Sequence, residues 1–231
     1  MISQRQKPQC CPLFRSRASE YQRFSEEDLP VSDYIWKRSE DLLQKARQTI
    51  FISGIRNGKL DPNFYAVYTL QDALYCRIVS HLWAQVAADR FDVDADIRSF
   101  AEKVSSKYKG ADVSMCKAWQ VNDIAVGEYV LRYTGFIEKK IKEYAPNALI
   151  ATYACVKLWH TLTSELLKTV PKDNPYRVWV DAMHSSGTTA REQAALIDKH
   201  FGFNREAALS MFRNAMQHEI DFFNYGGEIK K

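Results

Sequence analysis

The stretch "GKLDPNFYAVYTLQDALYC", residues 58–76, combines the signals that end one helix and begin the next. Gly58 suits the position just after a helix, because glycine adopts a positive φ angle without steric strain. The next helix is expected to start at Asp61 with Pro62 in its first turn, where the missing N–H group costs no helical hydrogen bond. From residue 65 onward, apolar side chains recur at helical spacing. The stretch therefore predicts two helices joined by a short turn.

The same helical spacing continues through most of the chain. A first helix is expected from about Ser32 to Asn57, and residues 124–170 predict two long helices bent or split near Pro146. Further helix starts are indicated by "DVDADIRSF", by Asn174 followed by Pro175, by "TTAREQ" and by Asn204. The sequence shows neither strand-like alternation nor an internal repeat. We therefore expect an all-α fold, a bundle of about eight helices.

Length and composition fit one domain with a sizeable core, since 46% of the 231 residues are hydrophobic. The 32 basic and 28 acidic residues are spread evenly, so no block favours nucleic acid or an anionic membrane as a partner. No run approaches the roughly 18 apolar residues of a membrane span, and the N-terminus lacks a secretory signal. We expect a helical domain at residues 31–231 in a cytoplasmic protein.

Residues 1–30 form an N-terminal extension that we interpret as disordered. They are rich in Arg and Ser and contain no acidic residue before Glu20, so a mitochondrial presequence is the alternative. The five cysteines are odd in number and include no C-x-x-C pair. They suit a reducing compartment and argue against structural zinc.

Three helical segments place a reactive side chain on an apolar face. Tyr68, Asp72 and Tyr75 share one face, and Asp72 is either a solvated edge residue or a buried acid that exchanges protons in a pocket. Cys155 shares a face with Trp159 and is either a small core residue or a nucleophile. Glu219 likewise lies in an apolar stripe, and is either a solvated edge residue beside His218 and Asp221, which this segment alone favours, or a buried acid. A thiol and two carboxyl groups from different helices can converge inside a bundle into a covalent catalytic site.

A metal site is the competing interpretation. Asp181 with His184, and His218 with Asp221, have a spacing similar to that of ligands in di-iron bundles. Five scattered histidines do not supply the several inward-facing His and Glu ligands that such a site needs. We therefore expect no metal and no cofactor.

Three stretches together resemble the TenA (thiaminase II) family. "FISGIRNGKLDPNFYAVYTLQDALY" resembles its signature of a Phe, a G-x-L turn and Y-x-x-Q-D-x-x-Y. "CVKLWHTLTSELLKTVPKDNPYRVWVDAM" resembles its segment from the catalytic cysteine to P-Y-x-x-W-I, and "HEIDFF" resembles its closing E-x-x-F-W. The resemblance extends from about residue 31 to 225 and is weakest between 92 and 145.

The resemblance implies a heme-oxygenase-like helical fold without haem, assembled as a dimer or tetramer. It gives Cys155 the role of the nucleophile that adds to a pyrimidine ring and expels the attached group. It gives Asp72 the role of the acid that contacts both thiol and pyrimidine, and Glu219 that of the carboxyl group that manages protons on the ring nitrogen and leaving group. The substrate-binding residues that it implies are Phe51, Tyr68, Tyr75, Tyr129, Trp159 and Met183.

The chain departs from the family at two of these positions. Trp159 and Met183 stand where the family often has tyrosines, so two hydroxyl groups are lost. The drier wall favours attack by a nucleophile other than water, and hence base exchange over hydrolysis. The expected function is cleavage of thiamin or a thiamin-derived aminopyrimidine, with a small-molecule partner and neither nucleic acid nor membrane. The alternative is a non-catalytic protein that binds an aminopyrimidine or another small molecule on the same fold.

Overall fold

The turn at residues 58–62 forms as the sequence predicts. The computed structural model describes residues 28–88, 91–119, 124–202 and 204–228. In it, Gly58 has a left-handed backbone with φ of 64°. The carboxylate of Asp61 accepts hydrogen bonds from the backbone N–H groups of Asn63 and Phe64, at 2.7 and 3.2 Å. These bonds cap the helix that Pro62 begins.

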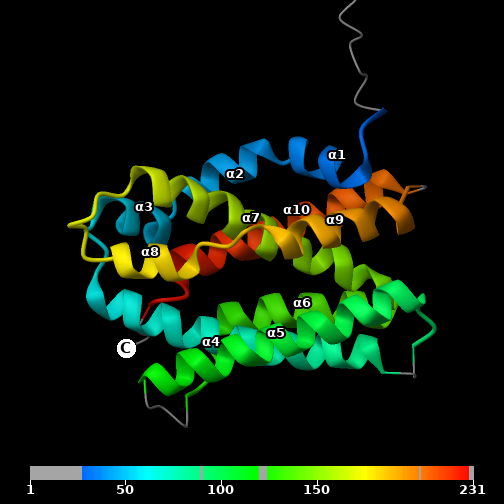
Figure 1. Ribbon diagram of the computed structural model, residues 1–231, viewed down its shortest axis with the longest axis horizontal. Coiled ribbons are helices and arrows are strands. Elements are labelled where there is room, and N and C mark those ends of the chain that lie inside the picture. The colour runs from blue at the N-terminus through cyan, green and yellow to red at the C-terminus, as the bar shows by residue number, and fades with distance from the viewer. Residues whose placement is uncertain (1–27, 89–90, 120–123, 203, 229–231) are drawn as a thin grey trace, which may run out of the picture.

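The described residues form ten α-helices and no strand, and the structure is 80% helical (Figure 1). The elements are α1 (Val31–Lys37), α2 (Glu40–Arg47), α3 (Ile50–Asn57), α4 (Pro62–Ala87), α5 (Ala95–Trp119), α6 (Glu128–Glu143), the 3-10 helix η2 (Ala145–Asn147), α7 (Ala148–Thr169), α8 (Arg177–Met183), α9 (Thr188–His200) and α10 (Arg205–Tyr225). The all-α prediction is confirmed. The expected split near Pro146 falls at η2, and most of the N-terminal extension, residues 1–27, lies outside the described residues.

The expected single helix from Ser32 to Asn57 is wrong, because three helices, α1 to α3, cover this stretch. The hydroxyl of Ser39 donates to the carbonyl of Ile35 at 2.8 Å, and that of Thr49 donates to the carbonyl of Ala46 at 2.7 Å. Such local bonds offer the backbone an alternative to continuous helix. The two breaks raise the number of helices from the expected eight or so to ten.

The expected helix start at Asn174 and Pro175 also needs correction, because α8 begins at Arg177. The side-chain oxygen of Asn174 accepts a hydrogen bond from the backbone N–H of Tyr176 at 2.8 Å. Its amide group donates to the carbonyl of Ile55 at 3.0 Å. Asn174 thus closes a turn and fastens it to the end of α3, and the helix starts later.

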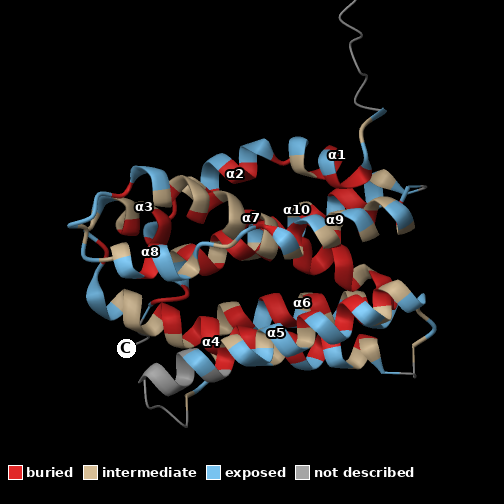
Figure 2. Cartoon of the chain, viewed as in Figure 1, coloured by how far each residue is buried: buried red, intermediate tan, exposed pale blue. Residues whose placement is uncertain are grey.

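Helices α7 and α10 form the centre of the molecule. In Figure 1, α4, α5 and α6 lie on one side and α1 and α2 on the other, with α7 and α10 crossing between them. Every residue of α7 from Ala148 to Cys155 is buried, so this part of the helix is enclosed on all sides. Figure 2 shows the buried positions concentrated on the inward sides of the surrounding helices. None of the described helices has the length and apolar character needed to span a bilayer.

Candidate active site

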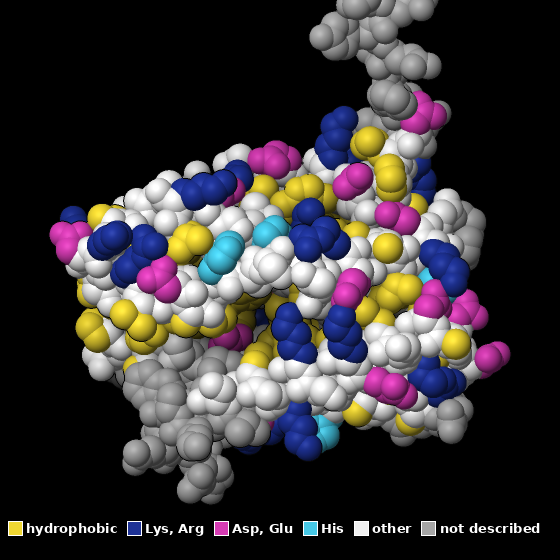
Figure 3. Space-filling model, viewed as in Figure 1, with side chains coloured by type: hydrophobic (Ala, Val, Ile, Leu, Met, Phe, Trp, Pro, Cys, Tyr) yellow, Lys and Arg dark blue, Asp and Glu magenta, His cyan; other side chains and the backbone are white. Residues whose placement is uncertain are grey.

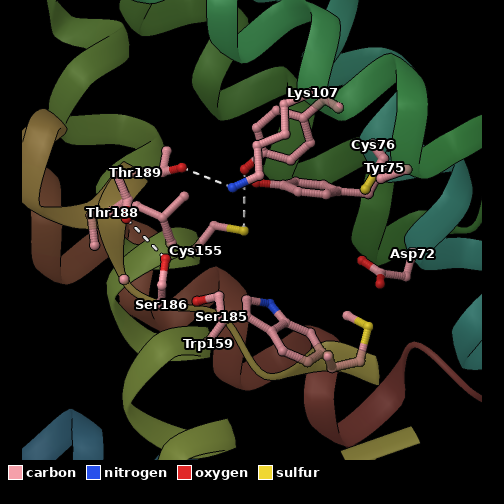
Figure 4. A pocket seen from close by; sticks show the side chains of 16 residues that line it. Asp72, Tyr75, Cys76, Lys107, Cys155, Trp159, Ser185, Ser186, Thr188 and Thr189 are labelled. Atoms are coloured by element: carbon pink, nitrogen blue, oxygen red, sulfur yellow. Dashed lines mark hydrogen bonds between the residues drawn. The ribbon is translucent and has the colours of Figure 1, made fainter. Parts of the chain in front are cut away.

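A cavity of about 210 Å³ lies between α4 and α5 on one side and α7, α8 and the start of α9 on the other. Five of the residues singled out in the sequence line it: Asp72, Tyr75, Cys155, Trp159 and Met183 (Figure 4). Figure 3 shows a hollow on this face, with hydrophobic side chains in its depth and Lys and Arg side chains on both sides. The cavity joins residues from five helices that are spread along the sequence.

Asp72 is a buried acid and not a solvated edge residue, since its exposed fraction is 8%. Burial raises its pKa from the usual 3.8 to about 7, because a carboxylate loses its hydration in the interior. The hydroxyl of the neighbouring Tyr75 is also buried; it makes no hydrogen bond of good geometry among the described residues, but it helps to lower the pKa of the Cys155 thiol. Asp72 and Tyr75 therefore offer a ligand one exchangeable proton and one free hydroxyl group.

Cys155 lies near the middle of α7 with its thiol facing the cavity (Figure 4). Burial raises the pKa of the thiol well above its usual range, and the charge of Glu219 raises it further. The hydroxyl of Tyr108 opposes this effect by donating a hydrogen bond to Sγ at 3.5 Å. The chemistry of this thiol therefore depends on the groups packed around it.

Glu219 on α10 is almost completely buried, with an exposed fraction of 1%. Burial raises its pKa from 4.5 to about 8, and the charge of Asp72 adds to the rise. The neighbouring Tyr133 hydroxyl and Cys155 thiol favour the charged form of Glu219, and so they partly offset this rise in its pKa. Both carboxyl groups therefore hold a proton more readily than they would in water, so each is suited to exchange a proton with a bound ligand near neutral pH.

The predicted aromatic residues divide into two groups. Phe51 and Tyr68 are fully buried and stack on each other with ring centroids 3.8 Å apart, outside the cavity lining. Tyr68 also stacks on Phe222 of α10 at 4.7 Å, and the charges of Asp72 and Glu219 raise its pKa in addition to burial. Phe51 and Tyr68 therefore support the wall that holds Asp72.

Tyr129 is not brought to this cavity. It lines another one, near the ends of α6 and α10, and its ring stacks on that of Tyr225 at 5.1 Å. The residue of α6 that reaches the site is Tyr133, one turn later. Its ring stacks on that of Tyr75 at 5.1 Å, and its hydroxyl affects the pKa of Glu219.

Sequence reasoning missed other residues that line the cavity or contact its functional groups. These are Cys76, Lys107, Tyr108, Tyr133 and the segment 185–189. Tyr108 and Tyr133 lie where the resemblance to a known family is weakest. For Tyr108 a signal exists, because Ala101, Val104 and Tyr108 recur at helical spacing and form the inner face of α5.

The two Asp–His pairs considered as metal ligands have other partners. Asp181 is exposed and accepts a hydrogen bond from Arg177 at 2.9 Å. The ring of His218 stacks on that of Tyr133 at 5.3 Å. Within the described residues, neither pair joins a third potential metal ligand.

Comparison with known sequences finds a distant relative that matches most of this chain. No protein-family model matches the chain. The thiamine biosynthesis multifunctional protein ThiED of Corynebacterium efficiens is 24% identical over 208 residues. That match covers 84% of this chain but 28% of ThiED, so the chain spans less than a third of this relative.

Two solved structures share the architecture along nearly their whole length. A TenA family transcription regulator from Silicibacter sp. TM1040 has a TM-score of 0.75 at 15% identity, over 85% of this chain and 96% of that one. A TenA homologue from P. horikoshii OT3 has a TM-score of 0.69 at 17% identity, over 84% and 97%. The expected heme-oxygenase-like helical fold is thereby confirmed, and its structural neighbours are TenA family proteins.

Proposed function

We propose that the chain is a thiaminase-type enzyme, an aminopyrimidine aminohydrolase that cleaves thiamin or a thiamin-derived aminopyrimidine. The observation that carries the proposal is the meeting of one thiol, Cys155, with two carboxyl groups of raised pKa, Asp72 and Glu219, inside the bundle. ThiED, the curated relative, is by its name a protein of thiamine biosynthesis.

The size and lining of the cavity support a single aromatic ring as the buried part of the substrate. An apolar cavity of about 150 Å³ accommodates benzene, so about 210 Å³ leaves room for a substituted pyrimidine. Tyr75 and Trp159 supply flat apolar surfaces. Asp72 and the free hydroxyl of Tyr75 supply polar partners for ring nitrogens and an amino group.

In the proposed mechanism, Asp72 accepts the thiol proton as the sulfur of Cys155 adds to a ring carbon. Glu219 donates its proton to a ring nitrogen, so that the ring takes up the electrons of the new C–S bond. The C–N bond to the leaving group then breaks, and its electron pair leaves on nitrogen. Water or another nucleophile then adds to the methylene carbon, and a proton released by water goes to the leaving group or to solvent. Glu219 takes its proton back from the ring nitrogen, Asp72 returns the thiol proton, and the C–S bond breaks to restore the thiol.

A non-catalytic small-molecule-binding protein is the second candidate. One structural neighbour is named a transcription regulator, so this fold occurs in proteins with that description. A binder keeps the pocket and needs no nucleophile. The cysteine beside two protonatable carboxyl groups favours the enzyme.

The test is to incubate the purified protein with thiamin and with formyl-aminopyrimidine, each with and without pyridine, and to identify pyrimidine products by mass spectrometry. Hydroxymethyl-pyrimidine identifies hydrolysis and a pyridine adduct identifies base exchange. Cys155→Ser is expected to abolish turnover while its circular dichroism spectrum and melting temperature stay near wild type. Retained turnover in that variant excludes the covalent mechanism.

Binding without turnover gives a different result. An aminopyrimidine then raises the melting temperature of the wild-type protein through preferential binding to the folded state, and no product forms. The cytoplasmic location and assembly into a dimer or tetramer remain predictions, and size-exclusion chromatography with light scattering tests the assembly.

A further inference from the structure

The opening of the cavity carries a lysine that the proposed chemistry does not use. Lys107 on α5 lines the opening, and its Nζ atom donates a hydrogen bond to the hydroxyl of Thr189 at 2.8 Å. Figure 4 shows this bond joining α5 to the start of α9 on the side of the cavity that holds Cys155. An ammonium group therefore stands at the opening, next to the proposed nucleophile.

A second positive group borders the same opening. Arg191 donates from Nη1 to the carbonyl of Ser186 at 2.8 Å and from Nη2 to the hydroxyl of Thr188 at 3.2 Å. Ser186 and Thr188 line the cavity. Within the described residues, Lys107 and Arg191 thus donate their hydrogen bonds to neutral oxygens and form no ion pair.

Lys103, one turn before Lys107 on α5, differs in this respect. Its Nζ atom lies 2.6 and 2.7 Å from the two carboxylate oxygens of Glu192, and it is absent from the cavity lining. Its charge is neutralised at close range. Lys103 and Lys107 therefore form a matched pair of exposed lysines on one helix, of which one belongs to the opening.

The arrangement of the cavity determines which part of a substrate meets Lys107. The groups suited to a pyrimidine, Asp72 and Tyr75, lie in the depth of the cavity. A volume of about 210 Å³ holds one substituted ring and does not enclose a second one. The leaving group consequently lies toward the opening, between Cys155 and Lys107.

We infer that the positive opening selects aminopyrimidines with an uncharged leaving group over those with a cationic one, and that Lys107 is the specificity-determining residue. The ammonium group of Lys107 repels a cationic leaving group at this position, whereas it does not repel a neutral amide. This inference rests on the proposed function and adds the class of leaving group to it.

Two pyrimidines that differ only in the leaving group isolate the effect. The aminomethyl-pyrimidine carries a protonated amine near neutral pH, as alkyl amines do, whereas its N-formyl derivative is neutral. In both, water supplies a hydroxyl group to the methylene carbon, and the leaving nitrogen departs with the electron pair of the broken C–N bond. The formyl-amide nitrogen takes up the proton of water and leaves as formamide, whereas the protonated amine leaves as ammonia and takes up that proton to become ammonium. Thiamin, whose thiazolium leaving group is a cation, serves as a second charged substrate.

The experiment compares kcat/KM for these three substrates in the wild type, Lys107→Gln, Lys107→Glu and the control Lys103→Gln. The ratio of charged to neutral substrate is expected to rise about fivefold in Lys107→Gln and further in Lys107→Glu. Lys103→Gln leaves the ratio unchanged. Raising the salt concentration to about 0.5 M weakens the effect, since this screens charges at an exposed opening. A ratio in Lys107→Glu within twofold of wild type overturns the inference, as does an equal change in Lys103→Gln.

A binding measurement separates this inference from the proposed function. If the wild type cleaves none of the three substrates, the proposed function fails. The charge preference is then measured with Cys155→Ser as the change in melting temperature caused by each pyrimidine, with and without Lys107→Glu. A preference for the neutral pyrimidine that Lys107→Glu removes supports selection by charge without catalysis, and absence of stabilisation by either pyrimidine overturns it.

Discussion

The hydroxyl of Tyr108 on α5 donates a hydrogen bond to the Sγ atom of Cys155 on α7, across 3.5 Å. The contact joins α5 to the proposed nucleophile. Helix α5 lies in the part of the chain where the resemblance to the TenA family is weakest. Burial and the carboxyl charges raise the pKa of the thiol, and the Tyr108 hydroxyl lowers it. Tyr108 therefore helps the sulfur to exist as a thiolate in a site that otherwise disfavours it.

Replacing Tyr108 with Phe removes this donor with little change in packing. Hydrogen bonds to charged groups contribute about 1.5–3 kcal/mol, so the thiol pKa is expected to rise by about one unit or more. The measurement is the pH profile of Cys155 alkylation by iodoacetamide, read by mass spectrometry, together with kcat. Alkylation and kcat near neutral pH are expected to fall at least tenfold.

The control for this substitution is Tyr153→Phe, which removes the hydroxyl of a buried tyrosine on α7 that is absent from the cavity lining. We expect Tyr153→Phe to leave the pH profile of Cys155 alkylation unchanged. An unchanged profile in Tyr108→Phe would show that Tyr108 serves packing alone.

The two buried carboxyl groups predict how stability depends on pH. Asp72 and Glu219 have pKa values of about 7 and about 8 in the folded chain, against 3.8 and 4.5 as ordinary values. Between these limits the folded state binds more protons than the unfolded state, so the free energy of unfolding falls as pH rises. Their stabilising contribution is complete below about pH 4 and is lost as pH rises through the folded values.

Urea denaturation between pH 5.5 and 9 tests this dependence. The free energy of unfolding of the wild type is expected to fall by about 2 kcal/mol through Asp72 and about 3 kcal/mol through Glu219. Glu219→Gln removes one contribution and flattens the curve. Glu102→Gln, at an exposed site on α5, is the matched control and keeps the wild-type slope. Equal slopes for Glu219→Gln and the wild type contradict a buried, proton-holding Glu219.

Gly187 has a specific steric role at the opening of the cavity. Its φ angle is 72°, and a Cβ atom there would lie 2.7 Å from Nε2 of His160. The other ring nitrogen of His160, Nδ1, lies 3.0 Å from the carbonyl oxygen of Ser185, in the same segment. Gly187→Ala is therefore expected to cost about 1–3 kcal/mol of stability and to weaken ligand binding, because segment 185–189 moves.

Gly135 in α6 supplies the opposite case. A Cβ atom built there meets no atom within 4 Å. Gly135→Ala is expected to stabilise the protein by about 0.5–1 kcal/mol through lower backbone entropy in the unfolded chain. Thermal and urea denaturation of both variants check the prediction, which fails if the two alanines have the same sign of effect.

The sequence predicted helices and the meeting of reactive groups better than it predicted which neighbours complete the site. Helical spacing placed Asp72, Cys155 and Glu219 on inward faces, because burial of apolar surface determines how a helix is oriented. Tyr129 and Tyr133 are one turn apart on nearly the same face, so periodicity does not decide which of them reaches Glu219. Only the packing of α6 against α10 distinguishes them.

The breaks between α1, α2 and α3 were missed for a different reason. The hydroxyl bonds of Ser39 and Thr49 to preceding carbonyls do not change the apolar spacing of the stretch. Lys107 was missed because an exposed lysine on a helix is usually a solvated residue. Its position at the cavity follows from how α5 packs on α9, which no local pattern encodes.

We expect Met183 and Trp159 to favour an acceptor other than water in the proposed reaction, because both line the cavity and neither offers a hydroxyl group that would hold a water molecule. Met183→Tyr restores one such hydroxyl and is expected to shift the products from the pyridine adduct toward hydroxymethyl-pyrimidine by severalfold. The measurement is the ratio of the two products at a fixed pyridine concentration. Met183→Phe, which adds a ring without a hydroxyl, separates polarity from size. If the wild type forms only hydroxymethyl-pyrimidine with excess pyridine present, the dry wall does not select the acceptor, and water reaches the intermediate by another route.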